Sequence, residues 1–151
     1  MSEVTVDIDI DAPPEKVWEV IMDPSRFGEW VTIHRKIHSA DSGPPREGAK
    51  MEQTLCLRGA NFKVKWELAE CHASRHATWE GRGPMHSHAR TAYDLSANGN
   101  GGTRFHYTNE FKAPGGPFGA AASRVLVGGL PEREANASLQ KLKRLLESSN
   151  E

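Results

Sequence analysis

The chain has 151 residues, of which 37% are hydrophobic, and it contains four tryptophans, so it is long enough for one domain with a buried core. Nineteen basic and twenty acidic side chains give a formal net charge of -1. This balance predicts no DNA binding through a positive surface field, and the short apolar stretches predict no membrane span.

The cysteine content points to a reducing compartment. Cys56 and Cys71 are the two cysteines, and the N-terminal residues do not show the pattern of a secretory signal peptide. Two thiols in such a chain are typical of a reduced protein rather than of a disulfide framework. We therefore expect one cytoplasmic domain that covers residues 1–151.

The N-terminal segment predicts a strand followed by two very short helices. Residues 4–10 alternate between apolar and polar side chains, which is typical of a strand with one solvated face. The Pro13-Pro14 pair ends this strand and is compatible with the first turn of a helix. Asp23 then predicts the capped start of a second short helix that buries Trp30.

Six further segments show the alternation of strands with one solvated face. They cover residues 32–38, 50–58, 62–68, 76–82, 90–95 and 104–112. Short turn signals separate them, such as the glycine- and asparagine-rich run 98–102. Consecutive strands with short turns predict an antiparallel meander, which has seven strands when the N-terminal strand is included.

A long helix is predicted at the C-terminal end. After a break at residues 115–117, a helical pattern runs from Phe118 to about Leu146, and Gly128-Gly129 and Pro131 should kink or loosen its first half. One apolar stripe follows the helix and consists of Ala135, Leu139, Leu142 and Leu146. We expect an α+β fold in which a curved seven-stranded antiparallel sheet wraps around this helix.

Four sequence features together resemble one superfamily. Residues 10–14 run into Val17-Trp18, residues 23–27 lead to Trp30, residues 102–104 enter the last strand, and a long helix follows. Their order and spacing resemble the SRPBCC or START-like superfamily, which includes polyketide cyclases/dehydrases and lipid-transport domains. The resemblance spans the whole chain. It implies the helix-grip fold, with a ligand cavity between the sheet and the C-terminal helix.

The resemblance leaves the function open, because the superfamily includes carriers, cyclases, hormone receptors and toxins. Residues 29–34 also resemble bacterial members that are named as toxins of toxin–antitoxin pairs, some of which act on ribosomes. This second resemblance implies an action through protein or ribosome contacts.

Strand parity predicts which side chains line the inside of the sheet. The predicted ligand-binding residues of apolar parity are Gln53, Trp66, Trp79, Thr91, Tyr93, Phe105, Tyr107, Asn109 and Phe111. An aromatic surface with a few polar groups is typical of a ligand pocket. The aromatic residues are equally compatible with an ordinary core, and the two amides with hydrogen bonds to water or to the backbone.

Arg35 is a further ligand-binding candidate if residues 32–38 form a strand without a bulge. It then shares a face with Ile33 and Ile37, and an inward guanidinium would hold a carboxylate or phosphate, or polarise a ketone. By the same parity Glu70 shares the inward face with Leu68, but its position near the end of a strand favours a solvated side chain.

No motif identifies a catalytic centre, a metal site or a cofactor. The sequence contains no nucleophile elbow, P-loop, dinucleotide fingerprint or HExxH helix. His86 and His88 share the outward parity, and no second cluster of cysteine or histidine completes a metal-ligand set. We therefore expect neither metal nor cofactor, and the catalytic residues of any reaction stay unknown.

Three functions remain open, and we favour the first. It is the binding of a small hydrophobic molecule, such as a lipid, a polyketide or a related metabolite, by a monomer or weak homodimer. The second is a cyclase/dehydrase, for which Arg35, Glu70, Tyr93 and Tyr107 are the available polar groups. The third is a toxin-like protein that acts on a protein partner.

Overall fold

The body of the molecule is one antiparallel sheet that carries its main helices on one side. The computed structural model describes residues 2–57, 60–112 and 130–148. In chain order the elements are β1 (Ser2–Ile10), α1 (Pro14–Ile21), η1 (Pro24–Arg26), α2 (Phe27–Trp30), β2 (His34–Ala40), β3 (Lys50–Leu57), β4 (Ala60–His72), β5 (His76–Arg82), η2 (Pro84–His86), β6 (His88–Ala97), β7 (Thr103–Lys112) and α4 (Leu130–Ser148).

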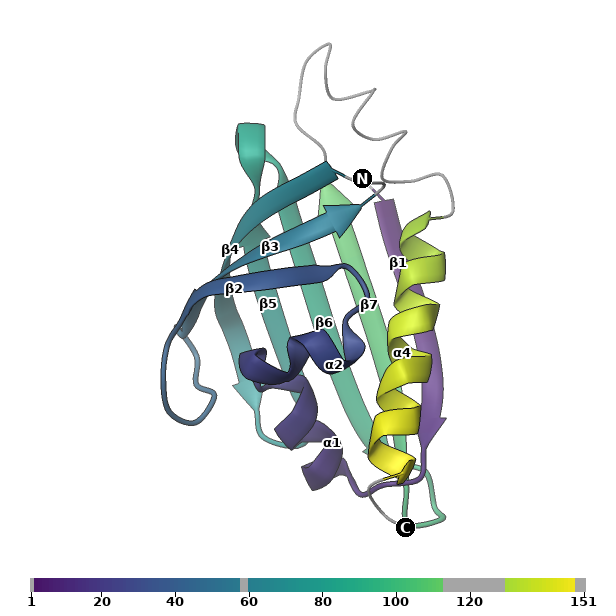
Figure 1. The fold of residues 1–151 in the computed structure, drawn as a ribbon. Coiled ribbons are helices and arrows are strands. Elements are labelled where there is room, and N and C mark those ends of the chain that lie inside the picture. The colour runs from purple at the N-terminus through teal and green to yellow at the C-terminus, as the bar shows by residue number, and fades with distance from the viewer. Residues whose placement is uncertain (1, 58–59, 113–129, 149–151) are drawn as a thin grey trace.

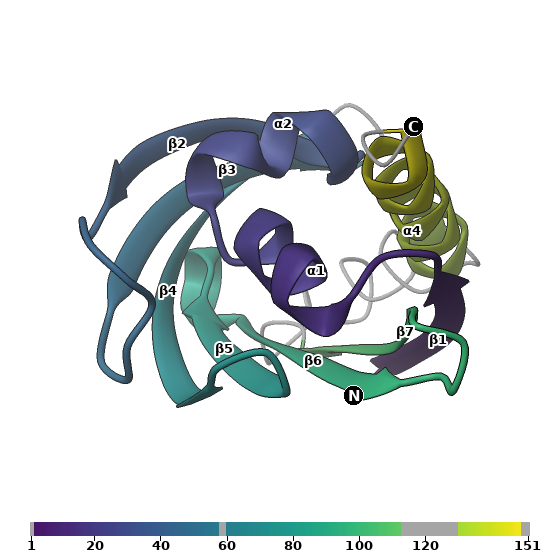
Figure 2. The ribbon, with the colours of Figure 1, turned by 90° about the horizontal axis from the view of Figure 1, so that it is seen from below.

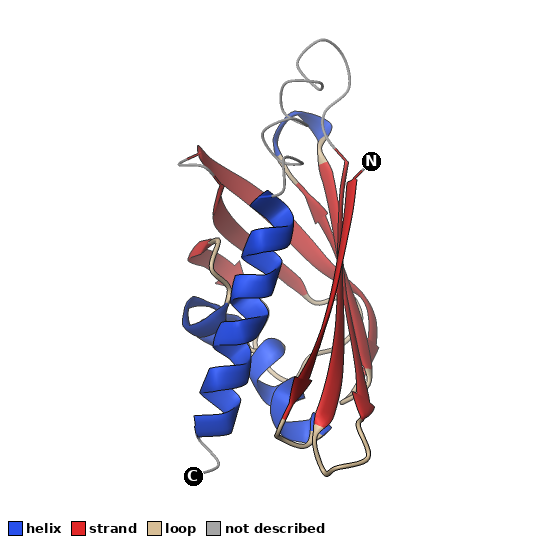
Figure 3. Ribbon diagram, turned by 90° about the vertical axis from the view of Figure 1, so that its right-hand side faces the viewer, coloured by secondary structure: helices blue, strands red, loops and turns tan. Residues whose placement is uncertain are grey.

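The sheet has seven strands in the order β1-β7-β6-β5-β4-β3-β2, and each neighbouring pair is antiparallel. It curves around α1 and α2, and α4 lies at its open side beside β1 (Figure 1, Figure 2). α4 packs against β1 and α2, and it runs along one face of the strands (Figure 3). The arrangement confirms the predicted helix-grip α+β fold.

Prolines and an aspartate set the boundaries of the short N-terminal helices, as predicted. α1 begins at Pro14, where the missing N–H would have had no helical partner. The Asp23 carboxylate accepts a hydrogen bond from the backbone N–H of Ser25 at 3.0 Å and so caps η1, a single 3-10 turn. α2 follows directly and buries Phe27 and Trp30 against the core.

Apolar packing and a few polar bonds fix α4. Its predicted stripe is buried at Ala135, Leu139, Leu142 and Leu146. The backbone N–H of Thr32 donates to Ser138 Oγ at 3.0 Å, and Lys143 Nζ donates to the carbonyl oxygen of Asp9 at 2.7 Å. These bonds tie α4 to the segment after α2 and to β1.

Register shifts in β2 and β4 break the predicted parity, and two of them change the face of a residue singled out above. In β2 the register with β3 shifts between His34 and Lys36, so Arg35 is exposed, and the expectation that it faces inward is wrong. In β4 the register shifts between Leu68 and Glu70, so Glu70 leaves the inward parity and is exposed, as its position near the strand end favoured. A bulge adds an unpaired residue and reverses the faces on one side of it.

The C-terminal helix differs from the expectation at its start. Residues 118–129, including Gly128-Gly129, lie outside the described residues. Pro131 is the second residue of α4, where the first turn accommodates proline, so no kink arises from it. Within the described ranges, no helix combines the length and the apolar character that crossing a bilayer requires.

Candidate functional site

The inner face of the sheet, which is the face beneath α4, is aromatic with a few polar groups. Of the residues predicted there, the buried ones are Gln53, Trp66, Trp79, Thr91, Tyr93 and Phe105. Tyr107 and Asn109 are half-buried and pair in register with Tyr93 and Thr91, so they share this face. Phe111 pairs with Ala89, and its side chain lies outside the described part of the chain.

A chain of three polar side chains crosses the inner face from β4 to β2. The Trp66 indole N–H donates to Gln53 Oε1 at 3.0 Å. Because this contact occupies the oxygen of the amide, the Gln53 NH₂ group is the one that faces His34 Nδ1, at 2.8 Å. An indole is only a donor, so it fixes the orientation of the amide and therefore the direction of both bonds.

The orientation of Gln53 decides the protonation state of His34. Nδ1 must accept from the amide, so the neutral ring carries its proton on Nε2. Burial lowers the pKa of His34 from its usual value, which also favours the neutral ring. The rings of Phe27 and His34 pack in a T-shaped arrangement, with their centroids 5.9 Å apart. His34 is therefore a neutral hydrogen-bond donor at the junction of α2 and β2.

Sequence parity missed His34, because it assigns His34 and Arg35 to the wrong faces. The bulge after His34 places it on the same side as Gln53, opposite Leu55 of β3. The available signal was the polar Gln53 in a strand of otherwise apolar inward residues, because a buried amide needs a partner.

Gly81 allows the Trp66 indole to reach Gln53. The two residues are opposite each other in β4 and β5, and a Cβ at position 81 would lie 2.7 Å from Trp66 Cε3. Such a distance is too short for carbon atoms, so the indole can occupy this position only because residue 81 has no side chain.

An aromatic cluster occupies the inner face of β6 and β7. Tyr93 stacks on Tyr107 at a centroid distance of 5.9 Å and contacts Phe105 at 5.6 Å and Trp30 at 6.3 Å. Burial raises the pKa of Tyr107 to about 12 and raises the pKa of Tyr93 further. Both phenols therefore stay protonated near neutral pH and act as hydrogen-bonding groups, not as bases.

Two further polar groups lie beside this cluster. The Thr91 hydroxyl donates to Asn109 Oδ1 at 3.4 Å, and a hydrogen bond from Asn109 partly offsets the rise in the pKa of Tyr107. The amide of Asn109 thus has protein partners on its own face, which agrees with the expectation that a buried amide is satisfied.

Hydrogen-bond donors without acceptors are the other feature of the interior. Among the described residues, the buried indole N–H groups of Trp30 and Trp79 have no acceptor. In the same part of the chain, no Asp, Glu, Lys or Arg side chain is buried. In the part of the chain that the structure describes, the interior is therefore uncharged and contains two unpaired donors.

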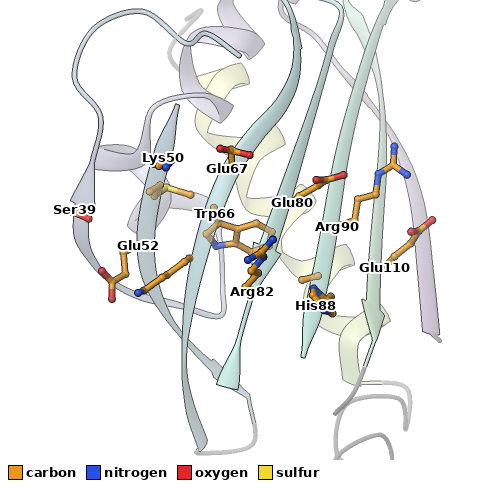
Figure 4. Close-up of a pocket in the computed structure, with 14 residues that line it drawn as sticks. Ser39, Lys50, Glu52, Trp66, Glu67, Glu80, Arg82, His88, Arg90 and Glu110 are labelled. Carbon is orange, nitrogen blue, oxygen red and sulfur yellow. The ribbon is translucent and has the colours of Figure 1, made fainter. Parts of the chain in front are cut away.

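A groove on the outer face of the sheet has the opposite character. It encloses about 880 Å³ and crosses β3 to β7 between charged side chains (Figure 4). One row consists of Lys50, Glu67, Glu80, Arg90 and Glu110, and the other of Glu52, Lys65, Arg82 and His88. Ionised walls bind apolar molecules poorly, so this groove does not suit a hydrophobic ligand.

The described residues contain no cluster of three or more His, Cys, Asp or Glu side chains arranged to hold an ion. His88 is exposed on the outer face, as predicted. Glu70 contacts His76 Nε2 at 3.1 Å on that same face, away from the aromatic cluster.

Comparison with known proteins agrees with this architecture. The solved structure of the Zhui aromatase/cyclase from Streptomyces sp. R1128 superposes with a TM-score of 0.75 at 15% identity, covering 99% of this chain and 96% of that one. In Mycobacterium tuberculosis H37Rv, the uncharacterized protein Rv1546 is 24% identical in an alignment 145 positions long that covers 85% of this chain and 90% of that protein.

A second relative from that organism is named Toxin Rv0910. It is 28% identical over 83 residues, which are 55% of this chain, and the match spans 58% of the toxin's own length. The profile of one family, described as polyketide cyclase / dehydrase and lipid transport, matches residues 1–147. The chain therefore belongs to the polyketide cyclase/dehydrase and lipid transport family.

Proposed function

We propose that this protein binds a small hydrophobic molecule, such as a lipid, a polyketide or a related metabolite, on the inner face between the sheet and α4. The observation that carries the proposal is the aromatic, uncharged inner face, crossed by the chain Trp66–Gln53–His34. An apolar surface with a few oriented polar groups is the usual composition of a small-molecule site. Family membership supports the same conclusion.

The proposed contacts combine the inward residues with the histidine that the bulge turns inward. Arg35 is not among them, because it is exposed. The ligand-binding residues are His34, Gln53, Trp66, Trp79, Thr91, Tyr93, Phe105, Tyr107, Asn109 and Phe111.

The protonation states favour binding over proton abstraction. Nδ1 of His34 is occupied by Gln53 and Nε2 carries a proton, so the ring offers a donor and no free basic nitrogen. Tyr93 and Tyr107 are held protonated by burial. The described inner face therefore orients a ligand oxygen but supplies no general base.

Thermal unfolding tests the proposal with a matched pair of variants. Thr91→Phe adds an aromatic ring to the inner face, and Ala92→Phe adds the same ring to the outer face of the same strand. We expect amphiphiles with ketone, ester or hydroxyl groups to raise the Tm of the wild type and of Ala92→Phe, because a ligand that binds only the folded state stabilises it by mass action. Equal stabilisation of Thr91→Phe would place the binding elsewhere.

A cyclase or dehydrase activity is the second candidate, because His34 Nε2–H is a neutral donor that would polarise a ketone. The structural likeness to an aromatase/cyclase supports the same idea. Incubation with polyketide-like substrates, followed by mass spectrometry of the products, tests it. Turnover that His34→Ala or Tyr107→Phe abolishes, with binding retained, would favour the enzyme, whereas binding without turnover would leave the carrier.

A toxin-like action is the third candidate, because one partial relative is named a toxin. It predicts growth inhibition on expression that survives Thr91→Phe, since the effect would use the protein surface.

We place the protein in the cytoplasm, which the free thiols of Cys56 and Cys71 support. Fractionation of the native host tests the location.

A further inference from the structure

The charged groove on the outer face contains two cross-strand pairs of like charge. Glu67 of β4 lies directly opposite Glu80 of β5, and two residues along, Lys65 lies opposite Arg82. Like charges at opposed positions of an antiparallel pair are unfavourable. All four side chains are exposed, and within the described ranges none of them forms an ion pair.

Most other strand pairs of the groove place opposite charges together; Arg82 opposite His88 does not. Lys50 faces Glu67 across β3 and β4, Glu52 faces Lys65, and Glu80 faces Arg90 across β5 and β6. An ordinary solvated sheet face with mixed charges accounts for these pairs. It does not account for an acidic pair and a basic pair that lie next to each other on the same two strands. Local rules are broken most often where a surface has a function.

The exceptions are complementary across the groove. The acidic pair belongs to one wall and the basic pair to the other, with the strands as floor (Figure 4). On each of β3, β4 and β5, the charged residues two positions apart therefore have opposite signs: Lys50 with Glu52, Glu67 with Lys65, and Glu80 with Arg82.

We propose that this face is the contact surface of a weak homodimer whose twofold axis runs along the groove. Such an axis places the acidic pair of each copy, Glu67 and Glu80, against the basic pair of the other copy. Glu67 then meets Lys65 of the partner subunit, and Glu80 meets Arg82 of the partner subunit. A twofold interface repeats each contact in reverse, so every pair occurs twice.

A second copy suits this surface better than an unrelated partner, because its charge pattern is complementary by symmetry and needs no further assumption. The axis keeps the strands of the two sheets aligned, which is a common packing of sheets about 10 Å apart, and long charged side chains span that space. Exposed ion pairs contribute little each, so the dimer is weak and salt-dependent. This inference does not depend on the ligand-binding proposal.

Sedimentation velocity of the full chain tests the proposal. The Debye length falls from about 30 Å in about 0.01 M salt to about 3 Å in about 1 M salt, so the dimer should form in the first buffer and dissociate in the second. Glu80→Arg and Arg82→Glu should each raise the dissociation constant at low salt by at least about tenfold, because like charges then meet across the axis. Glu19→Arg on α1 and Arg144→Glu on α4 change the net charge equally at exposed positions and should leave it unchanged.

Mixing the two groove variants gives the decisive result. A copy with Glu80→Arg carries two cations where a copy with Arg82→Glu carries two anions, so an equimolar mixture should form a heterodimer although each variant alone is monomeric. Circular dichroism checks that both variants fold. A wild type that stays monomeric at low salt overturns the proposal. A mixture of the two variants that stays monomeric also overturns it, because the groove would then bind another protein or the dimer contact would lie elsewhere.

Discussion

Replacing Gln53 by leucine tests whether the chain Trp66–Gln53–His34 stabilises the inner face. Gln53 is 4% exposed and accepts the indole N–H of Trp66, which is 7% exposed. Leucine has no acceptor, so the buried N–H loses its partner, whereas the half-buried His34 can bond to solvent. An unsatisfied buried donor costs about 1–3 kcal/mol of unfolding free energy. At about 2–4 °C per kcal/mol for a chain of this size, the Tm should fall by about 2–12 °C.

Urea unfolding followed by circular dichroism measures this cost. Trp66→Phe removes the donor instead of the acceptor, and the double variant leaves no orphaned partner. The double variant should therefore cost less than the sum of the single ones, by about 0.5–3 kcal/mol. Gln140→Leu, at an exposed position of α4, is the matched control. The reasoning fails if Gln53→Leu costs no more than this control and shows no coupling to Trp66→Phe.

Three further predictions concern packing and pH. Gly81→Ala brings a Cβ to 2.7 Å from Trp66 Cε3 and should cost about 1–3 kcal/mol in urea unfolding, and no loss would mean that the indole does not lie over β5. Leu142→Ala opens a cavity under α4, where Leu142 is 0% exposed, and should cost about 2–5 kcal/mol; a cost below about 1 kcal/mol would show that α4 is loosely docked. Burial lowers the pKa of His34 from 6.5, so the folded chain binds fewer protons there than the unfolded chain. The neutral ring therefore adds to the free energy of unfolding above pH 6.5, and this contribution is lost as the pH falls through the lowered pKa of His34 in the folded chain. If His34→Gln leaves the pH dependence of the unfolding free energy unchanged, the burial of this ring is contradicted.

Alternation predicted most of the sheet because one face is buried along nearly every strand. In the pairing of β5, β6 and β7, the inward positions of Trp79, Thr91 and Tyr93 follow directly from the period of two. The cap at Asp23 and the stripe of α4 were equally readable, because each depends on residues close in sequence.

The β-bulges could not be predicted from the alternation of apolar and polar residues. In β2 only Ile37 is an apolar marker of the inward face, and one extra residue between it and His34 exchanges the faces of His34 and Arg35. Arginine favours the exposed face, but the single residue Arg35 does not outweigh the alternation of Ile33 and Ile37 around it. The partners of Gln53 were beyond reach for the same reason, since they depend on how three strands meet.

Native mass spectrometry of the freshly purified protein tests the central claim most directly. The account predicts a retained small molecule in the wild type and in Ala92→Phe, and a sharply reduced bound fraction in Thr91→Phe. Detection of the unliganded mass alone in all three proteins, with no Tm response to the amphiphile panel, would contradict the claim that the inner face is a binding site.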